Sequence, residues 1–88
     1  HSMIVKENGT LWGAGFNYYG QLGTGDTDNV ADATAIMGDV NSIYSGSQNS
    51  IVLKNDGTLW VAGQNNYGQL GIGGSENLNL FTKLELEE

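Results

Sequence analysis

Residues 5–29 of the chain read VKENGTLWGAGFNYYGQLGTGDTDN, and residues 53–77 read LKNDGTLWVAGQNNYGQLGIGGSEN. The two segments align without gaps at an offset of 48 residues, and fifteen of the 25 aligned pairs are identical. Self-similarity at a fixed period of this size is typical of repeat proteins, in which each repeat is one supersecondary unit. We therefore divide the chain into a first repeat, residues 1–48, and a second repeat, residues 49–88, each forming a partial unit of one larger segment.

Each copy begins with a sequence typical of a β-hairpin. A short apolar run, Met3 to Val5 or Ile51 to Leu53, precedes Asn8-Gly9 or Asp56-Gly57, and Thr-Leu-Trp follows. Asn-Gly and Asp-Gly between β-rich runs favour a hairpin with a type I′ turn, whose two central residues both need positive φ. We predict two hairpins of this type.

Glycine-dense segments follow both hairpins, at residues 20–25 and 68–74. They are too short and too rich in helix breakers to form helices. A further apolar segment, residues 40–44, precedes the second hairpin and indicates another strand. Several short strands in a repeat of 48 residues are typical of a β-propeller blade. The predicted fold is all-β, with two β-propeller blades, each a four-stranded antiparallel sheet.

The segments GTLWGAGFNYYGQLGTGD and GTLWVAGQNNYGQLGIGG resemble the repeats of the regulator of chromosome condensation family. Asn-x-Tyr-Gly-Gln-Leu-Gly is similar to the hallmark of that family, and IYSGSQNSIVL at residues 43–53 resembles its strand-and-turn opening. The resemblance implies a β-propeller that closes from about seven such repeats. It also implies that the two blades of this chain are part of a larger or oligomeric propeller.

The recurring motif residues are interpreted as architecture. The glycines supply left-handed backbone or close packing between neighbouring sheets, the asparagines bond turn backbone, and the leucines fill the space between blades. The aromatic residues favour an inter-blade core over a ligand cage, and we expect both tryptophans to lie in equivalent, largely buried environments. The motif comprises Gly9, Trp12, Gly15, Asn17, Tyr19, Gly20, Gln21, Leu22 and Gly23, and in the second copy Gly57, Trp60, Gly63, Asn65, Tyr67, Gly68, Gln69, Leu70 and Gly71.

Composition argues against several classes of function. Three lysines against ten acidic residues give a net charge of −7, which repels nucleic-acid phosphate and anionic lipid. We therefore expect neither nucleic acid nor a membrane as a partner. The chain has no cysteine, and His1 is its one histidine, so the parts of a Ser-His-Asp or Cys-His site are missing. The chain is predicted not to be an enzyme, with no catalytic residue, no metal and no cofactor.

Two acidic arrangements offer alternatives. Asp26 and Asp28 could act as a carboxylate pair in acid–base chemistry, and residues 23–29 alternate oxygen-bearing side chains as calcium loops do. The second copy weakens the pair by placing Gly74 and Glu76 there, and counting from Asp26 puts Met37, a residue with no ligand oxygen, at the position of the bidentate glutamate. A solvated turn is the favoured interpretation.

Chain length favours association. Two full repeats need 2 × 48 = 96 residues and the chain has 88, so the first copy lacks its equivalent of residues 41–48. Repeat proteins need about three units to bury a continuous core, which predicts association with copies of itself, in rings of about three or four chains or as a swapped dimer, or with the rest of a longer propeller.

Three functional hypotheses follow. The first is a non-enzymatic protein–protein interaction scaffold, and the second is a structural building block that self-assembles into a propeller. As specific versions of the first hypothesis, the resemblance implies a regulator of a small GTPase or an inhibitor of an enzyme such as β-lactamase, although the charge of −7 argues against docking on chromatin. A hydrolase that depends on Asp26 or Asp28 ranks last.

Overall fold

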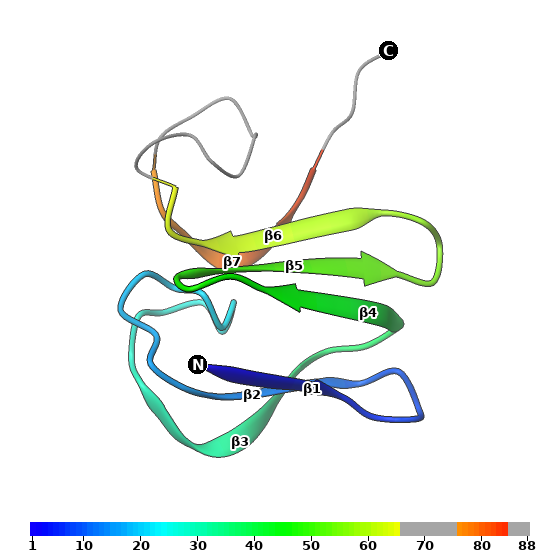
Figure 1. The fold of residues 1–88 in the computed structure, drawn as a ribbon, viewed down its shortest axis with the longest axis horizontal. Helices are drawn as coiled ribbons and strands as arrows, with labels where there is room; N and C mark the ends of the chain where they lie inside the picture. The colour runs from blue at the N-terminus through cyan, green and yellow to red at the C-terminus, as the bar shows by residue number, and fades with distance from the viewer. Residues whose placement is uncertain (66–75, 85–88) are drawn as a thin grey trace.

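The computed structural model describes residues 1–65 and 76–84, and these residues form seven strands in two sheets. Neighbouring strands are antiparallel, with the orders β1-β2-β3 and β4-β5-β6-β7, and the first sheet lies below the second in Figure 1. The prediction of an all-β fold is confirmed. No helix in the described part of the chain could cross a bilayer. The strands are β1 (Ser2–Val5), β2 (Leu11–Gly15), β3 (Val30–Met37), β4 (Val40–Ser45), β5 (Asn49–Lys54), β6 (Leu59–Gly63) and β7 (Leu78–Lys83).

The two sheets differ by one strand. The second has four strands as predicted, whereas the first has three, with β1 at its edge. The strand that the first sheet lacks is the equivalent of β4, which pairs with β5 through Tyr44 and Ile51. In the sequence β4 belongs to the first repeat, but in the structure it belongs to the second sheet. The chain therefore passes from the first sheet to the second between Met37 and Val40, before the repeat boundary at residues 48 and 49.

The hairpin turns are not of the predicted type. Gly9 has φ of +84°, but Asn8 does not have positive φ, so a type I′ turn is excluded. The Gly9 N–H donates to the carbonyl oxygen of Lys6 at 2.8 Å, and the Lys6 N–H donates to the carbonyl oxygen of Thr10 at 3.0 Å. This pattern is a type I turn followed by a left-handed glycine, which forms a bulge. The Asn8 Oδ1 atom stabilises it by accepting a hydrogen bond of 3.1 Å from the Thr10 N–H.

The second hairpin repeats this geometry. Gly57 has φ of +87°, and its N–H donates to the carbonyl oxygen of Lys54 at 3.0 Å. Asp56 takes the role of the asparagine, because its Oδ1 atom accepts from the Thr58 N–H at 2.9 Å. The prediction of hairpins was therefore right in place and wrong in turn type in both copies.

The core lies between the two sheets. Leu11, Val40 and Val52 are buried against one another, and partly buried side chains from both sheets pack around them. The crossover between the sheets is held at its hairpin end, since the Val40 N–H donates to the carbonyl oxygen of Gly9 and the Asn55 N–H to that of Asp39, both at 2.9 Å. The sheets are thus fixed at one end, and the long loop that follows β2 emerges at the other.

Candidate functional site

The part of the first motif copy from Asn17 to Gly23 lies in the β2–β3 loop, residues 16–29, whose structure depends on Asn17. This residue is fully buried, and its Oδ1 atom accepts a hydrogen bond of 2.9 Å from the Leu22 N–H. Its Nδ2 atom lies 3.1 Å from the carbonyl oxygen of Asp26 and 3.0 Å from that of Asp28. An amide side chain offers two N–H donors and one carbonyl acceptor, and here both functions are used. One side chain therefore ties the two halves of the loop together.

Gln21 joins the loop to the second sheet. The residue is fully buried, and its carbonyl oxygen accepts a hydrogen bond of 2.7 Å from Oγ of Ser50 in β5. Its Oε1 atom accepts from the Tyr19 N–H at 3.0 Å, while its Nε2 atom donates to Oε1 of Gln48 at 3.3 Å. The side chain thus connects the backbone of its own loop to Gln48, and the backbone carbonyl adds a second bond to the neighbouring blade.

The glycines of the loop allow it to lie directly on β7. Gly20 and Gly23 have φ of +77° and +70°, and a Cβ atom at Gly20 would stand 2.5 Å from Cα of Asn79. At Gly23 a Cβ would overlap the ring of Phe81. The Gly25 N–H donates to the carbonyl oxygen of Asn79 at 2.7 Å, so the loop also bonds to the edge of the second sheet. These positions combine left-handed backbone with contact between sheets.

Leucine and glycine are paired within the first blade. Leu22 is fully buried, and its Cδ2 atom lies 3.2 Å from the place of a Cβ at Gly13 in β2.

Gly15 at the end of β2 has φ of +108° and Gly63 at the end of β6 has φ of +113°, each beside a register shift in its sheet. Here too the backbone needs a residue without Cβ.

The second copy reproduces the start of this network. Asn65 is fully buried, its N–H donates to Oδ1 of Asn77 at 2.8 Å, and its Nδ2 atom donates to the carbonyl oxygen of Glu76 at 3.1 Å. The corresponding bond of the first copy joins the Asn17 N–H to Oδ1 of Asn29 at 2.8 Å. The remaining motif positions of the second copy lie outside the described residues; they are Tyr67, Gly68, Gln69, Leu70 and Gly71.

The tryptophans are equivalent in one respect and differ in another. Trp12 and Trp60 are both partly buried, and each carries a lysine ammonium over its ring, with Lys6 at 4.0 Å and Lys54 at 4.8 Å from the ring centroid. Nε1 of Trp60 donates to Oγ1 of Thr58 at 2.8 Å, whereas Nε1 of Trp12 is buried without a partner among the described residues.

The second hairpin also contains a perturbed carboxylate. The Asp56 carboxylate accepts hydrogen bonds from Oγ1 of Thr58 at 2.6 Å and from its N–H at 2.9 Å. These two bonds lower the pKa of Asp56 below its ordinary value, and the charges of Lys54 and Lys83 lower it further. The group is a stabilised turn carboxylate on the surface.

The acidic alternatives are engaged in loop structure. Oδ1 of Asp26 accepts from Oγ1 of Thr24 at 3.2 Å and from the Asp28 N–H at 3.1 Å. Within residues 1–65 and 76–84, no three acidic, histidine or cysteine side chains gather as a metal site would require. The carbonyl oxygens that a calcium loop would offer at Asp26 and Asp28 point instead to the Asn17 amide.

The structure brings together one pair that the sequence reasoning missed. Nε2 of His1 lies 3.1 Å from Oγ of Ser50. A serine hydroxyl beside an imidazole is the arrangement of an activated nucleophile. Ser50, however, is fully buried and directs its hydroxyl proton to the carbonyl oxygen of Gln21, so this oxygen is not open to a substrate. The pair serves the contact between the blades.

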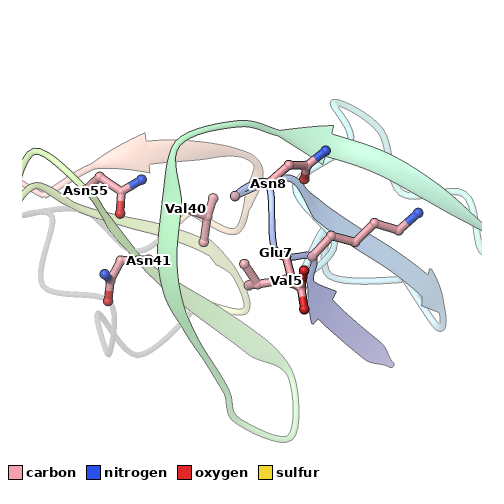
Figure 2. Close-up of a pocket in the computed structure, with 8 residues that line it drawn as sticks. Val5, Glu7, Asn8, Val40, Asn41 and Asn55 are labelled. Atoms are coloured by element: carbon pink, nitrogen blue, oxygen red, sulfur yellow. The ribbon is translucent and has the colours of Figure 1, made fainter.

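A hollow of about 430 Å³ lies at the hairpin end of the molecule. Figure 2 shows Val5 and Val40 in its middle, with Asn41 and Asn55 to one side and Asn8 to the other. The amide groups can donate and accept hydrogen bonds, but the lining contains no serine, histidine or cysteine. Among the motif residues that the structure describes, Gly9 alone lines this hollow.

Sequence reasoning also missed two exposed aromatic side chains in the loop. Phe16 is 46% exposed and Tyr18 is 66% exposed, on either side of the buried Asn17. The signal that could have found them is a difference between the copies, because the second repeat has Gln64 and Asn66 at these positions. Side chains that are present in one copy and absent from the other are not needed for the architecture that both copies share.

Comparisons with known proteins agree with this geometry. Two sequence models of the regulator of chromosome condensation (RCC1) repeat match the chain, one over residues 8–53 and the other over residues 40–69. No curated protein matches the sequence. The fold is similar to that of human WBSCR16, with a TM-score of 0.84 at 21% identity over 96% of this chain.

A second solved structure, that of Kap60 bound to yeast RCC1 (Prp20), is similar with a TM-score of 0.84 at 22% identity over 98% of this chain. The chain spans only 23% of the human structure's chain and 21% of the yeast structure's chain. At these identities the likeness shows the fold, two sheets that match part of a propeller.

Proposed function

The chain belongs to the family of regulator of chromosome condensation repeats, and from this premise we propose that it is a non-enzymatic β-propeller segment that acts as a scaffold for protein–protein interaction. Propellers present loops of variable sequence on a rigid framework, and binding residues lie disproportionately on such loops. The proposal rests on the β2–β3 loop, which is fixed from within and yet exposes large side chains.

The fixation of this loop is the observation that supports the proposal most directly. Asn17, Gln21 and Leu22 are fully buried, whereas Phe16 and Tyr18 on the same loop are exposed. A loop held in one conformation loses little conformational entropy when it binds, so more of the contact energy appears as affinity. The arrangement therefore suits recognition of another macromolecule.

Charge narrows the class of partner. The net charge of −7 disfavours nucleic acid and anionic membranes, and it favours a protein with a basic surface. The regulatory roles suggested by the family resemblance, on a small GTPase or as an enzyme inhibitor, have no specific residue in their favour within the described part of the chain.

Self-assembly is a second candidate function, because the first sheet is open on two sides. Its edge strand β1 has β2 as its one neighbour in the sheet, and residues 31–35 of β3 are exposed over their whole length. In the second sheet the corresponding outer strand, β7, lies under the β2–β3 loop, with Phe81 against Gly23. A second copy of the chain would supply both missing contacts.

Photo-cross-linking separates the two functions. A photoreactive amino acid is placed at Thr27, in the exposed part of the loop, and in a second variant at Ala33, on the open face of β3. The scaffold proposal predicts that one protein from the source organism cross-links from position 27 and then binds the purified chain reversibly in calorimetry. Cross-links from both positions to copies of the chain alone would contradict the scaffold role and support the building block.

A further inference from the structure

Two exposed aromatic residues of the β2–β3 loop and a half-buried one form one continuous cluster. The ring centroids of Phe16 and Tyr18 are 6.2 Å apart with nearly parallel planes, and those of Tyr18 and Tyr19 are 5.1 Å apart with perpendicular planes. Phe16 and Tyr19 also meet edge to face at 6.4 Å. These distances lie in the range of favourable aromatic pairs. We call these three residues the ring cluster.

The fold does not need the outer two rings. Tyr19 recurs as Tyr67 in the second copy, but Phe16 and Tyr18 are replaced by glutamine and asparagine. The loop backbone is held by other groups, such as the Gln21 side chain on the Tyr19 N–H. Two exposed rings on a fixed loop, at positions where the second copy has polar side chains, indicate a binding surface.

Two acidic residues belong to the same loop as the cluster. The carbonyl oxygens of Asp26 and Asp28 are bonded to the side chain of Asn17, which is the residue between Phe16 and Tyr18. Both aspartates are exposed. Aromatic faces and carboxylates both attract cations, and arginine in addition stacks its planar guanidinium on rings.

The chain itself shows the same preference at another place. Lys6 lies over the ring of Trp12, and Lys54 lies over that of Trp60. Lys83 is the remaining lysine, and the chain has no arginine. Two of the three lysines thus lie over tryptophan rings, and none of the three is found over a ring of the cluster. A cation that binds the ring cluster would therefore come from another molecule.

We propose that the ring cluster, together with Asp26 and Asp28, is the docking surface for an arginine-bearing basic segment of a partner protein. This inference rests on the proposed scaffold function and names the surface and the partner chemistry. The guanidinium groups stack on the rings, and the carboxylates complement their charge. The rings provide specificity, and the net charge of −7 accelerates the encounter.

The test uses fluorescence anisotropy with a fluorescein-labelled peptide in which glycine alternates with arginine. A peptide with glutamine in place of arginine and a neutral maltooligosaccharide serve as matched probes. The expected result is saturable binding of the arginine peptide, weakened by added salt, with no binding of either other probe. Absence of arginine-peptide binding, or equal binding of the glutamine peptide, overturns the proposal, and binding of the sugar instead points to carbohydrate recognition and likewise overturns it.

Variants separate the rings from the overall charge. The double change Phe16→Gln with Tyr18→Asn installs the residues of the second copy and leaves the net charge unchanged. It should weaken binding by about tenfold, because two ring contacts with a cation are lost. Asp28→Asn should weaken binding by about two- to threefold at low salt. The matched control is Tyr44→Asn, which removes an exposed ring (61%) from β4 and should change nothing.

One outcome of this series is decisive. Binding that survives Phe16→Gln with Tyr18→Asn would mean that the charge of the whole chain attracts the peptide, and the ring cluster would be rejected. If that double variant does not melt cooperatively, the single change Tyr18→Asn provides the same comparison at the more exposed ring. If the ring cluster is rejected, the chain can still act as a scaffold through another surface, which the cross-linking experiment tests. The two proposals therefore fail separately.

Discussion

The ring of Phe81 in β7 occupies the space that a Cβ atom at Gly23 would need. The loop of the first blade and the outer strand of the second therefore fit together because residue 23 has no side chain. The residue is also left-handed, with φ of +70°, so two independent reasons select glycine at this position. At Gly57, by contrast, the left-handed backbone is the one reason for glycine.

This contrast makes a test with a matched control. Gly23→Ala should lower the free energy of unfolding by about 3 kcal/mol or more, because overpacking against Phe81 adds to the strain of a left-handed alanine. Gly57→Ala should cost about 1–2 kcal/mol, since Gly57 has φ of +87° but no atom within 4 Å of its missing Cβ. Urea unfolding monitored by tryptophan fluorescence measures both, and equal losses would show that Phe81 moves aside at little cost.

A second prediction concerns the amide of Asn17. Asn17→Ala removes the acceptor of the Leu22 N–H and the donor to two carbonyl oxygens in a fully buried place, so we expect a loss of about 3 kcal/mol. Asn29→Ala is the control, because the Asn29 side chain is exposed and accepts one hydrogen bond, from the Asn17 N–H. Its loss should be about 1 kcal/mol. Similar midpoints for the two variants in chemical unfolding would contradict the central role of Asn17.

The sequence predicted those parts of the fold that depend on local chemistry. Hairpins at Asn8-Gly9 and Asp56-Gly57 and a strand from Val40 follow from turn residues and apolar runs, and the structure contains them. The turn type could not be predicted in the same way, because both Asn-Gly turns and bulged turns place glycine at positive φ. The bulged turn in the structure is stabilised by the side-chain bond from the Thr10 N–H to Asn8.

Other features depend on contacts that a local pattern does not contain. The strand β3 reads VADATAIM, and its alanines and aspartate have low strand propensity, so pairing with β2 decides its conformation. The bond between Ser50 and the Gln21 carbonyl joins residues 29 positions apart, and no motif predicts it. The ring cluster could not be predicted from the repeat, because an alignment of the two copies indicates the residues they share, and Phe16 and Tyr18 are present in the first copy only.

A third prediction uses the pKa of Asp56. Because the folded-state pKa is lowered, ionised Asp56 stabilises the fold above the ordinary carboxylate value of 3.8, and this contribution is lost as the pH falls through the folded pKa. Thr58→Val removes the side-chain hydrogen bond, which is the largest cause of the shift, and should raise the pKa toward its ordinary value. Thr58→Ser keeps the hydroxyl and should leave the pKa low. Carboxyl carbon chemical shifts in an NMR titration give both values, and an unchanged pKa in Thr58→Val would assign the shift to the backbone N–H instead.

The last prediction tests association at β1 through a single backbone group. The Lys6 N–H donates to the carbonyl oxygen of Thr10 across the hairpin. In an antiparallel pair the backbone groups of successive residues point alternately toward the partner strand and away from it. The backbone N–H of Ile4 therefore points to β2, and that of Met3 points to the open edge.

Met3→Pro removes this N–H without removing a bond to β2, whereas Met3→Ala loses the side chain and keeps the N–H. If a strand of a second copy pairs with β1, light scattering after size exclusion should give an oligomer for the original chain and for Met3→Ala. The mass should fall toward 9.4 kDa for Met3→Pro. Equal masses for the two variants would show that association does not use this edge, and a cooperatively folded monomer of the original chain at micromolar concentration would show that no association is needed.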